Sequence, residues 1–349
     1  MTFEEIFAVD RSNMFALLKK FPQQVREAVA IGNAARIPPA WRKAQHIVLC
    51  GLGGSAIGGD LLRTLLAGEL KVPFLVQRNY TLPRFAGRST LVIISSYSGA
   101  TEETLAAHRE AVRRRAPILC ISSGGAVERT ARARRTPLIT IPGGLPPRAA
   151  LGYSFFPLLI ALQKAGLARD RRREISETIS LLEEKAAEYA VPDPAANRAL
   201  TLALLLRNRL GAVYSAAEPL EAVNLRWRGQ LAENAKTLAL GAVLPEMNHN
   251  ELVGWKVLRE QMAHMPVVFL RDRGEHRRVA RRIELTRGIL EGAAERVEEV
   301  WSEGRSGLAR MFSLVCLGDW VSYYLSILHG EDPTPVEVID RLKSELARS

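Results

Sequence analysis

A glycine-rich turn at residues 50–60, CGLGGSAIGGD, is the first segment whose composition suits chemistry. Five glycines fall within nine residues, and they let the backbone turn tightly and approach an anion closely. The turn follows a β-branched run and opens a helical pattern, so the free N–H groups of a helix start would face a bound anion. Ser55 adds a hydroxyl donor. We therefore predict a phosphate-binding turn that includes Gly53, Gly54 and Ser55.

A loop rich in serine and threonine at residues 94–104, ISSYSGATEET, also opens a helical pattern. Ser96, Ser98 and Thr101 each carry a hydroxyl, and Gly99 lets the backbone curl. Hydroxyls and main-chain N–H groups at a helix start form a nest that suits a phosphate monoester. N-capping of the helix is the simpler interpretation, but it needs only one hydroxyl. The loop is therefore predicted to bind phosphate.

A proline-containing segment at residues 141–152 follows the fifth predicted strand. It should lie at the carboxyl edge of the sheet, where ligands of open α/β sheets bind. Pro146 and Pro147 stiffen the segment and direct Arg148. A surface arginine in a loop is the alternative interpretation.

Two polar motifs occur in the second half of the chain. Glu233 lies in a helical pattern among basic residues, and a solvated pair with Lys236 is its simplest interpretation. His249 lies within LPEMNHNELVGW at 244–255, where its Asn and Glu neighbours could fix its tautomer.

A metal site is not expected. His249 and Glu246 stand three residues apart, but no second histidine stands four residues from His249. The cysteines at positions 50, 120 and 316 are too few and too scattered for a disulfide framework or a zinc site.

The elements that must position these motifs alternate along the chain. Apolar runs predict buried strands, and helical patterns separate them, which predicts an α/β fold with parallel doubly wound sheets. The strands are predicted at residues 46–50, 73–77, 90–95, 117–122 and 137–141, and then at 212–215, 266–270 and 296–301. The helices are predicted at residues 56–66, 101–114, 220–240, 275–290, 307–329 and 336–347.

Length and charge limit the class of protein. A chain of 349 residues suggests two domains. We predict an N-terminal domain over residues 1–165, a helical linker over 166–194 and a C-terminal domain over 195–349.

The net charge of +11 suits an acidic partner such as a phosphorylated metabolite. The Arg clusters lack motif or aromatic support, so they predict solvated helix faces and no nucleic-acid partner. Without a signal peptide or an apolar run of spanning length, a cytoplasmic protein with no membrane partner is expected.

The loop SYSGATEET, together with the preceding GGS turn, resembles the sugar isomerase (SIS) domain. With the distal motifs, nearly the whole chain resembles the bifunctional phosphoglucose/phosphomannose isomerases. The resemblance implies two SIS domains, a homodimer, hexose 6-phosphate substrates, and neither metal nor cofactor. It also implies that the substrate phosphate is held by Ser55, Ser96, Ser98 and Thr101. Ala100 replaces the asparagine common in the family's loop, and we expect a small effect.

The resemblance further assigns the catalytic groups. The Glu-Asn-Ala-Lys motif makes Glu233 the base that moves a proton between C2 and C1 through a cis-enediol. The Asn-His-Asn-Glu motif makes His249 the acid/base of ring opening, acting in its own subunit or in a neighbour's. Lys343 would assist ring opening, and Arg148 would stand beside the C1 and C2 oxygens, where a cation stabilises an enediolate.

The expected activity is interconversion of glucose 6-phosphate, and also of mannose 6-phosphate, with fructose 6-phosphate. Two alternatives remain open. The Gly51-x-Gly53-x-x-Ala56 pattern with Arg78 would suit an NADP-dependent oxidoreductase. A SIS module that senses phosphosugars without catalysis would suit a regulator, although the chain shows no helix-turn-helix segment.

Overall fold

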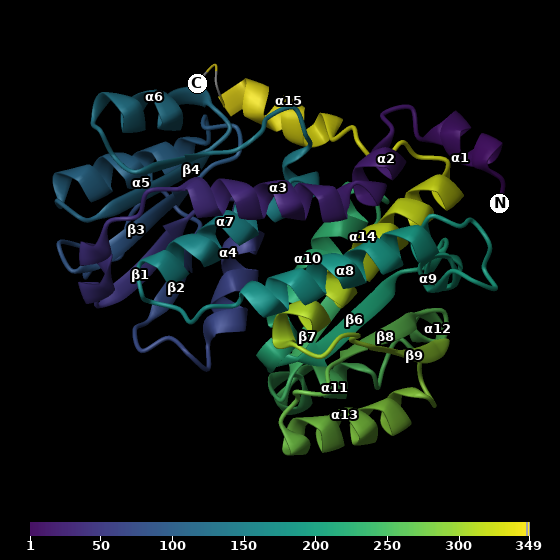
Figure 1. Ribbon diagram of the computed structural model, residues 1–349. Coiled ribbons are helices and arrows are strands. Elements are labelled where there is room, and N and C mark those ends of the chain that lie inside the picture. Colours follow the sequence, from purple (N-terminus) through teal and green to yellow (C-terminus); the bar gives the residue numbers. More distant parts are fainter. Residues whose placement is uncertain (347, 349) are drawn as a thin grey trace. The chain divides into compact units, whose positions relative to one another are not determined.

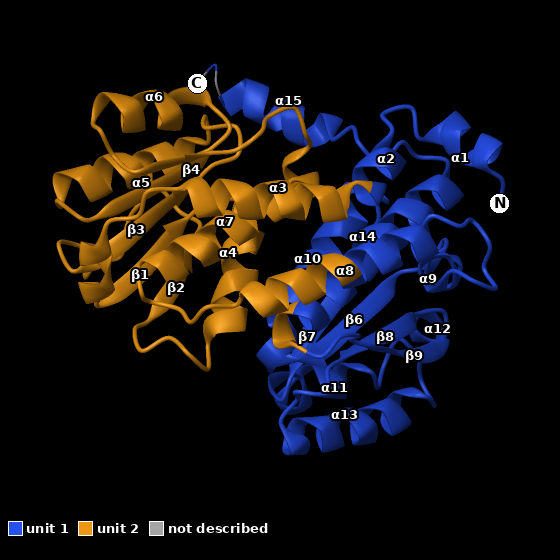
Figure 2. Cartoon of the chain, viewed as in Figure 1, with its two compact units in different colours: residues 1–19, 181–305, 309–349 blue, residues 20–180, 306–308 orange. Residues whose placement is uncertain are grey.

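The computed structural model describes residues 1–346 and 348 and divides the chain into two compact units (Figures 1 and 2). Unit 1 comprises residues 1–19, 181–305 and 309–349, and unit 2 comprises residues 20–180 and 306–308. The sequence predicts boundaries after residues 165 and 194. In the structure, a boundary falls inside helix α8 (Arg172–Tyr189), and residues 1–19 belong to the unit that contains most of the second half.

Unit 2 is built on a five-stranded sheet in which every neighbouring pair is parallel. The strand order is β2-β1-β3-β4-β5, so the order reverses between β1 and β3, and a crevice forms at such a point. The strands confirm the five predicted runs: β1 (His46–Cys50), β2 (Phe74–Gln77), β3 (Thr90–Ser95), β4 (Ile118–Ser122) and β5 (Leu138–Thr140).

Helices cover both faces of this sheet. Alternate strand residues such as Val48, Val92 and Cys120 pack with Ala107 of α5 (Glu102–Arg113) and Val127 of α6 (Gly125–Ala133). On the other face, α4 (Gly53–Leu66) runs so close to β1 that a Cβ on Gly59 would lie 2.8 Å from the Leu49 side chain. Helices α3 (Phe21–Ala34) and α7 (Leu151–Lys164) pack against each other, and α4 also contacts α7.

Unit 1 contains a four-stranded parallel sheet of order β7-β6-β8-β9. Its strands are β6 (Gly211–Ala216), β7 (Ala239–Leu244), β8 (Pro266–Arg271) and β9 (Arg296–Trp301). Its longer helices are α9 (Arg198–Leu206), α10 (Ala217–Glu233), α13 (Arg277–Leu290), α14 (Gly307–His329) and α15 (Glu337–Leu346). Residues 1–19 add α1 (Phe3–Val9) and α2 (Met14–Lys19).

Strand β7 corrects one prediction, because the sequence predicts a helix over residues 220–240. Helix α10 ends at Glu233, and Lys236 adopts a left-handed backbone conformation with φ 56°. Alanine and leucine dominate the following residues and favour helix in isolation. Pairing with β6 overrides that preference: a Cβ on Gly241 would lie 2.7 Å from the main-chain oxygen of Val213.

Helix α14 is long and apolar enough to cross a membrane by composition alone, with a mean hydropathy of 1.4. The continuous apolar runs within it are still shorter than a membrane span, because polar residues such as Asp319 interrupt them. In the structure 94% of its most apolar window is buried. Its residues Trp320, Tyr323 and Tyr324 pack against one another, and Phe15 of α2 packs on Trp320 and Tyr323. The apolar composition of α14 is thus that of a core helix.

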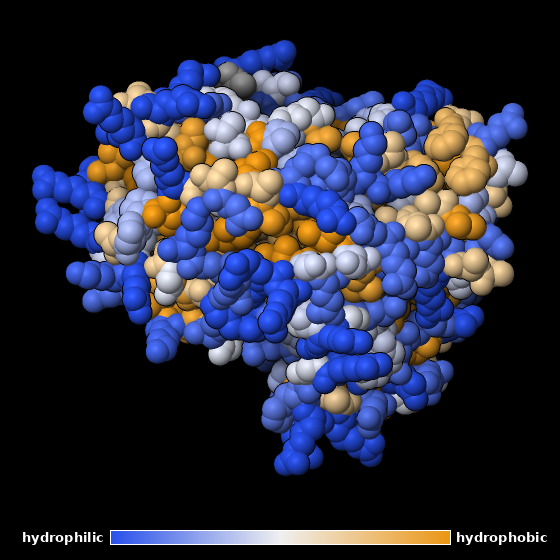
Figure 3. Space-filling model, viewed as in Figure 1, coloured by the Kyte–Doolittle hydropathy of each residue, from blue (hydrophilic) through white to orange (hydrophobic). Residues whose placement is uncertain are grey.

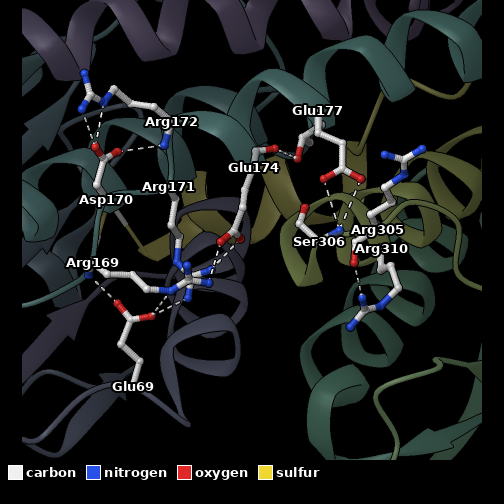
Figure 4. A network of polar contacts seen from close by, with 11 residues as sticks. Glu69, Arg169, Asp170, Arg171, Arg172, Glu174, Glu177, Arg305, Ser306 and Arg310 are labelled. Atoms are coloured by element: carbon white, nitrogen blue, oxygen red, sulfur yellow. Dashed lines mark hydrogen bonds and ion pairs between the residues drawn. The ribbon is translucent and has the colours of Figure 1, made fainter.

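The arginine clusters lie mostly on solvated helix faces, as predicted. Arg113 and Arg132 expose 77% and 65% of their side chains and pair with glutamates one turn away. Hydrophilic side chains cover much of the face seen in Figure 3. Arg171 is the exception: its side chain is 6% exposed and bridges Glu69, at 2.5 Å, and Glu174, at 2.6 Å (Figure 4). This cluster fixes the start of α8 to the segment that follows α4 within unit 2.

Candidate active site

Two loops of unit 2 meet at the carboxyl ends of β1 and β3. These strands are neighbours, and the sheet order reverses between them. The first turn of α4 and the loop before α5 are joined directly, because the Tyr97 N–H donates to Ser55 Oγ at 3.1 Å. Both loops predicted to bind phosphate therefore lie together in the crevice that open α/β sheets use for ligands.

The hydroxyls of the β3–α5 loop form a compact group. Ser96 Oγ lies 3.0 Å from Thr101 Oγ1 and accepts the Gly99 N–H at 3.1 Å. Ser96 is 2% exposed, whereas Ser98 is exposed and its Oγ accepts the Ala100 N–H at 3.3 Å.

The N-termini of α4 and α5 are left open for an anion. Thr101 is the N-cap residue of α5 and Leu52 that of α4, and within the described chain neither makes a side-chain capping bond. Simple N-capping therefore does not account for the hydroxyls of this loop. The first main-chain N–H groups of both helices could contribute to an anion site.

Close packing explains two glycines in the first turns of α4. A Cβ on Gly54 would lie 2.5 Å from the Pro147 main-chain oxygen, and one on Gly58 would lie 2.7 Å from Ser154 Oγ. The glycine pattern predicts close approach to a ligand. At Gly54 and Gly58 the atoms that approach closely belong to the protein itself. Gly53 differs, because its φ is +50° and a Cβ there would meet no described atom within 4 Å.

Arg148 is buried at the end of the proline-containing segment. It lies in the short helix η2 (Pro147–Ala149) and is 4% exposed, which excludes the surface-arginine alternative. Gln24 of α3 holds the next turn from both sides, donating to the Ala149 oxygen and accepting the Gly152 N–H, each at 2.8 Å. The Gly54–Pro147 contact packs this arginine's segment against the predicted phosphate turn.

Unit 1 contains Glu233 at the wall of a cavity of about 770 Å³. Glu233 is half-buried at the last residue of α10. Charged residues also line the cavity: Arg11 from the α1–α2 connection, Lys236 from the segment after α10, Glu331 from the segment after α14, and Glu337 from α15. Lys236 Nζ donates to the main-chain oxygens of Glu233, at 2.6 Å, and Pro333, at 3.1 Å. It thereby ties the end of α10 to the 330–336 segment.

A buried polar network holds α10 against α14. Asp319 accepts two bonds from Arg226, at 3.0 and 2.7 Å, and one from Gln230, at 2.8 Å. One turn later, Asn234 Nδ2 donates to Ser322 Oγ at 2.9 Å. Burial raises the pKa of Asp319, and Arg226 opposes that shift. These contacts fix the end of the helix that carries Glu233.

Replacing Asp319 by Ala should destabilise unit 1 by about 3–5 kcal/mol, because Arg226 would lose its buried carboxylate. Chemical denaturation of the variant and the parent measures the difference. Glu284→Ala is the control, since its pair with Arg281 is more than half exposed and should contribute less than about 1 kcal/mol. Equal loss in both variants would mean that the Asp319 network does not hold α10.

His249 and Lys343 are both exposed. His249 ends the short helix η3 (Glu246–His249), which follows β7, and Lys343 lies on α15. In the described part of the chain, neither residue is among those lining the cavity of Glu233.

The predicted support of the His249 tautomer is wrong, because its neighbours bond elsewhere. Asn248 donates to Thr286 at 2.8 Å, and Asn250 donates to Glu246 at 3.0 Å. Glu251 accepts the Tyr214 hydroxyl at 2.7 Å.

The sequence matches a known enzyme family. Residues 195–346 match the family model of the bacterial phospho-glucose isomerase C-terminal SIS domain. A bifunctional phosphoglucose/phosphomannose isomerase of Caldicellulosiruptor bescii is 42% identical over 336 residues, covering 96% of this chain and 99% of that protein. The chain belongs to the bifunctional phosphoglucose/phosphomannose isomerase family.

A second relative agrees with this membership, and a solved structure shares the fold. A bifunctional phosphoglucose/phosphomannose isomerase of Aquifex aeolicus is 37% identical over 86% of this chain and 90% of that protein. A hypothetical protein of Thermus thermophilus shares the fold, with a TM-score of 0.76 at 18% identity over 98% of this chain and 94% of that chain. The family resemblance and the α/β fold with two parallel sheets are thus confirmed.

Membership in this isomerase family argues against the oxidoreductase alternative, which depended on the glycine pattern at residues 51–56 and on Arg78. Arg78, which would have bound a 2′-phosphate, forms an ion pair with Asp60 of α4. Within residues 1–346 and 348, no group of three or more His, Cys, Asp or Glu side chains is arranged to hold a metal ion.

Sequence reasoning missed the residues that brace the isomerase's loops. Gln24 and Asp319 lie outside the quoted motifs, Tyr97 was given no role within its motif, and the contacts of all three depend on partners 42 to 128 residues away. A tyrosine flanked by the serines of the loop was visible in the sequence. Nothing local indicated which atoms it would contact.

Proposed function

We propose that this protein is an aldose–ketose isomerase that interconverts glucose 6-phosphate and fructose 6-phosphate, and mannose 6-phosphate and fructose 6-phosphate. The observation that carries the proposal is the direct junction of two hydroxyl-bearing loops at the carboxyl ends of β1 and β3. Family membership supports it, since relatives at 42% and 37% identity are named for both activities.

In this proposal unit 2 binds the substrate phosphate. Ser55, Ser96, Ser98 and Thr101 supply hydroxyls, and Gly53 and Gly54 shape the turn. Charge-assisted bonds from hydroxyl and N–H donors to a phosphate dianion are stronger than bonds between neutral groups. Arg148, aimed by Pro147, stabilises the oxygens at C1 and C2 as negative charge develops on them.

Glu233 is proposed as the base that moves the proton between carbons. Its carboxylate takes the C2 proton of the open-chain aldose, and the C1 oxygen gains a proton, which gives a cis-enediol. Return of a proton to C1 and loss of the O2 proton complete the ketose. Glucose and mannose 6-phosphates differ only at C2, so both give the same enediol. Rotation about the C2–C3 bond lets one base serve either epimer.

Ring opening precedes this chemistry. His249 is proposed to move a proton between the ring oxygen and O1, with Lys343 assisting. Imidazole suits this exchange because its ordinary pKa lies near neutrality. No metal or cofactor takes part in the proposed reaction.

We further propose that the protein acts in the cytoplasm as a homodimer, without a nucleic-acid or membrane partner. The segment that follows His249 supports a protein contact, because Val253, Val257 and Leu258 expose 72%, 70% and 61% of their surface. Apolar residues gathered in this way commonly mark an interface. A second subunit that covers them would fix the loop of His249.

A coupled assay with each of the three hexose 6-phosphates tests the proposed activity. Glucose and mannose 6-phosphates should both yield fructose 6-phosphate, and each should inhibit conversion of the other competitively. Failure to convert any of them would overturn the proposed function. Conversion of glucose 6-phosphate alone would overturn the dual activity.

Replacing Ser96 by Ala should weaken binding of every hexose 6-phosphate. Loss of one charge-assisted bond costs about 1.5–3 kcal/mol, which is roughly a 10- to 150-fold rise in Kd. Calorimetric titration measures the affinity. Ser89→Ala is the matched control, because Ser89 precedes β3 at its opposite end and should leave Kd unchanged. Unchanged affinity in Ser96→Ala would remove this loop from the phosphate site.

A further inference from the structure

Tyr97 contacts three loops of unit 2 through different atoms. Its main-chain N–H donates to Ser55 Oγ at 3.1 Å, in the first turn of α4 after β1. Its main-chain oxygen accepts from Ser123 Oγ at 2.6 Å and from the Ser123 N–H at 3.0 Å, after β4. Its phenol oxygen accepts the Leu145 N–H at 3.0 Å, in the proline-containing segment. Tyr97 is 9% exposed; its bond to Ser55 is buried, and its bonds to Ser123 Oγ and the Leu145 N–H are partly buried.

The phenol contact lies close to Arg148. Leu145 is followed by Pro146 and Pro147. Because proline restricts the backbone angle φ, the position of residue 145 constrains the position of Arg148. On the other side, Tyr97 is flanked by Ser96 and Ser98, two of the proposed phosphate ligands. One residue thus joins the proposed phosphate loop to the segment that carries the proposed enediolate-stabilising arginine.

We infer that Tyr97 is a positioning residue through which a bound phosphate sets the place of Arg148. The inference rests on the proposed function, since it takes the phosphate ligands and Arg148 as assigned there. The phosphate group of the substrate lies far from C1 and C2. Its binding energy aids catalysis only if phosphate binding also aligns the protein groups that act at those carbons. The Tyr97 bridge supplies a direct structural route for this effect.

Tyr97→Phe tests the bridge, because it keeps the ring and removes the acceptor of the Leu145 N–H. We expect kcat with fructose 6-phosphate to fall about 10- to 100-fold, the scale of a small misplacement of a catalytic group. Competitive inhibition by inorganic phosphate should be unchanged, since the loop hydroxyls remain. Tyr153→Phe is the matched control: Tyr153 is also buried in unit 2, but its hydroxyl bonds to Glu27, and kcat should hold within about twofold.

A second readout separates positioning from simple stability. Inorganic phosphite, added to the parent enzyme, should accelerate isomerisation of unphosphorylated fructose, and Tyr97→Phe should lose most of that acceleration. Equal acceleration in both proteins, or an unchanged kcat in Tyr97→Phe, would overturn the inference. If the parent itself fails to convert hexose 6-phosphates, the proposed function fails instead.

A measurement on the parent protein covers the case in which Tyr97→Phe does not fold. Amide hydrogen exchange in peptides spanning residues 142–148 should slow when inorganic phosphate saturates the protein. Exchange in the equally loop-like 191–197 segment, in unit 1, should not change. Slowing at the 94–104 loop without slowing at 142–148 would show that phosphate binds and that Tyr97 does not transmit its binding.

Discussion

Glu233→Gln should abolish nearly all exchange of the C2 hydrogen of glucose 6-phosphate with solvent. The substitution keeps the shape of the side chain at the end of α10 and removes the only group assigned to take the proton. Loss of a general base lowers a rate by about 10²- to 10⁴-fold. Nuclear magnetic resonance of the substrate in deuterated water measures the exchange. Binding of the substrate should change little, because the proposed phosphate ligands belong to unit 2.

Glu331→Gln is the matched control for this experiment. Glu331 lines the same cavity and is exposed, and it has no assigned role. Its variant should retain exchange within a few-fold of the parent. Retained exchange in Glu233→Gln, or equal loss in both variants, would contradict the assignment of Glu233 as the base.

His249→Ala should show a different defect, with turnover of ring-closed substrate falling by about 10²-fold or more. The open-chain form bypasses ring opening, so the variant should still exchange the C2 hydrogen of substrate that enters already open. Glu233→Gln should not do so. Comparing exchange from the open-chain fraction with overall turnover separates the two steps. Equal loss of both in His249→Ala would remove the ring-opening role.

Mixing the two inactive variants tests which subunit supplies His249. If the histidine acts in the neighbouring subunit, a heterodimer of Glu233→Gln and His249→Ala chains contains one site with both parental residues. About half of the parental activity per heterodimer should then return. No recovery, with subunit exchange demonstrated by mass spectrometry, would place both residues in the site of one chain. A monomeric parent protein would contradict the proposed homodimer itself.

The sheet of unit 2 was predictable because its central strands, β1, β3 and β4, are buried on both faces. Such strands read as continuous apolar runs, as in residues 46–50 and 90–95, and their neighbours carry helical patterns. The glycine-rich turn and the serine-rich loop could also be predicted from the sequence, because the left-handed backbone at Gly53 and Gly99 favours glycine.

Tertiary contacts decided what the sequence could not predict. Strand β7 consists mostly of alanine and leucine, which favour helix, and its pairing with β6 makes it a strand. The bonds around His249 go to Thr286 and Tyr214, which no spacing rule connects to residues 248 and 251. The grouping of residues 1–19 with unit 1 follows from contacts such as Tyr323 Oη to Asp10, 313 residues apart.

Fructose 6-phosphate incubated with the protein in deuterated water provides the most direct measurement of the central claim. Nuclear magnetic resonance should show glucose 6-phosphate and mannose 6-phosphate forming together, each carrying deuterium at C2 in part of its population. Both epimers arise from one enediol in this account, and a solvent-exchangeable carboxylic acid returns the proton. The account would be contradicted if neither aldose formed, if only one epimer formed, or if both formed with no deuterium at C2.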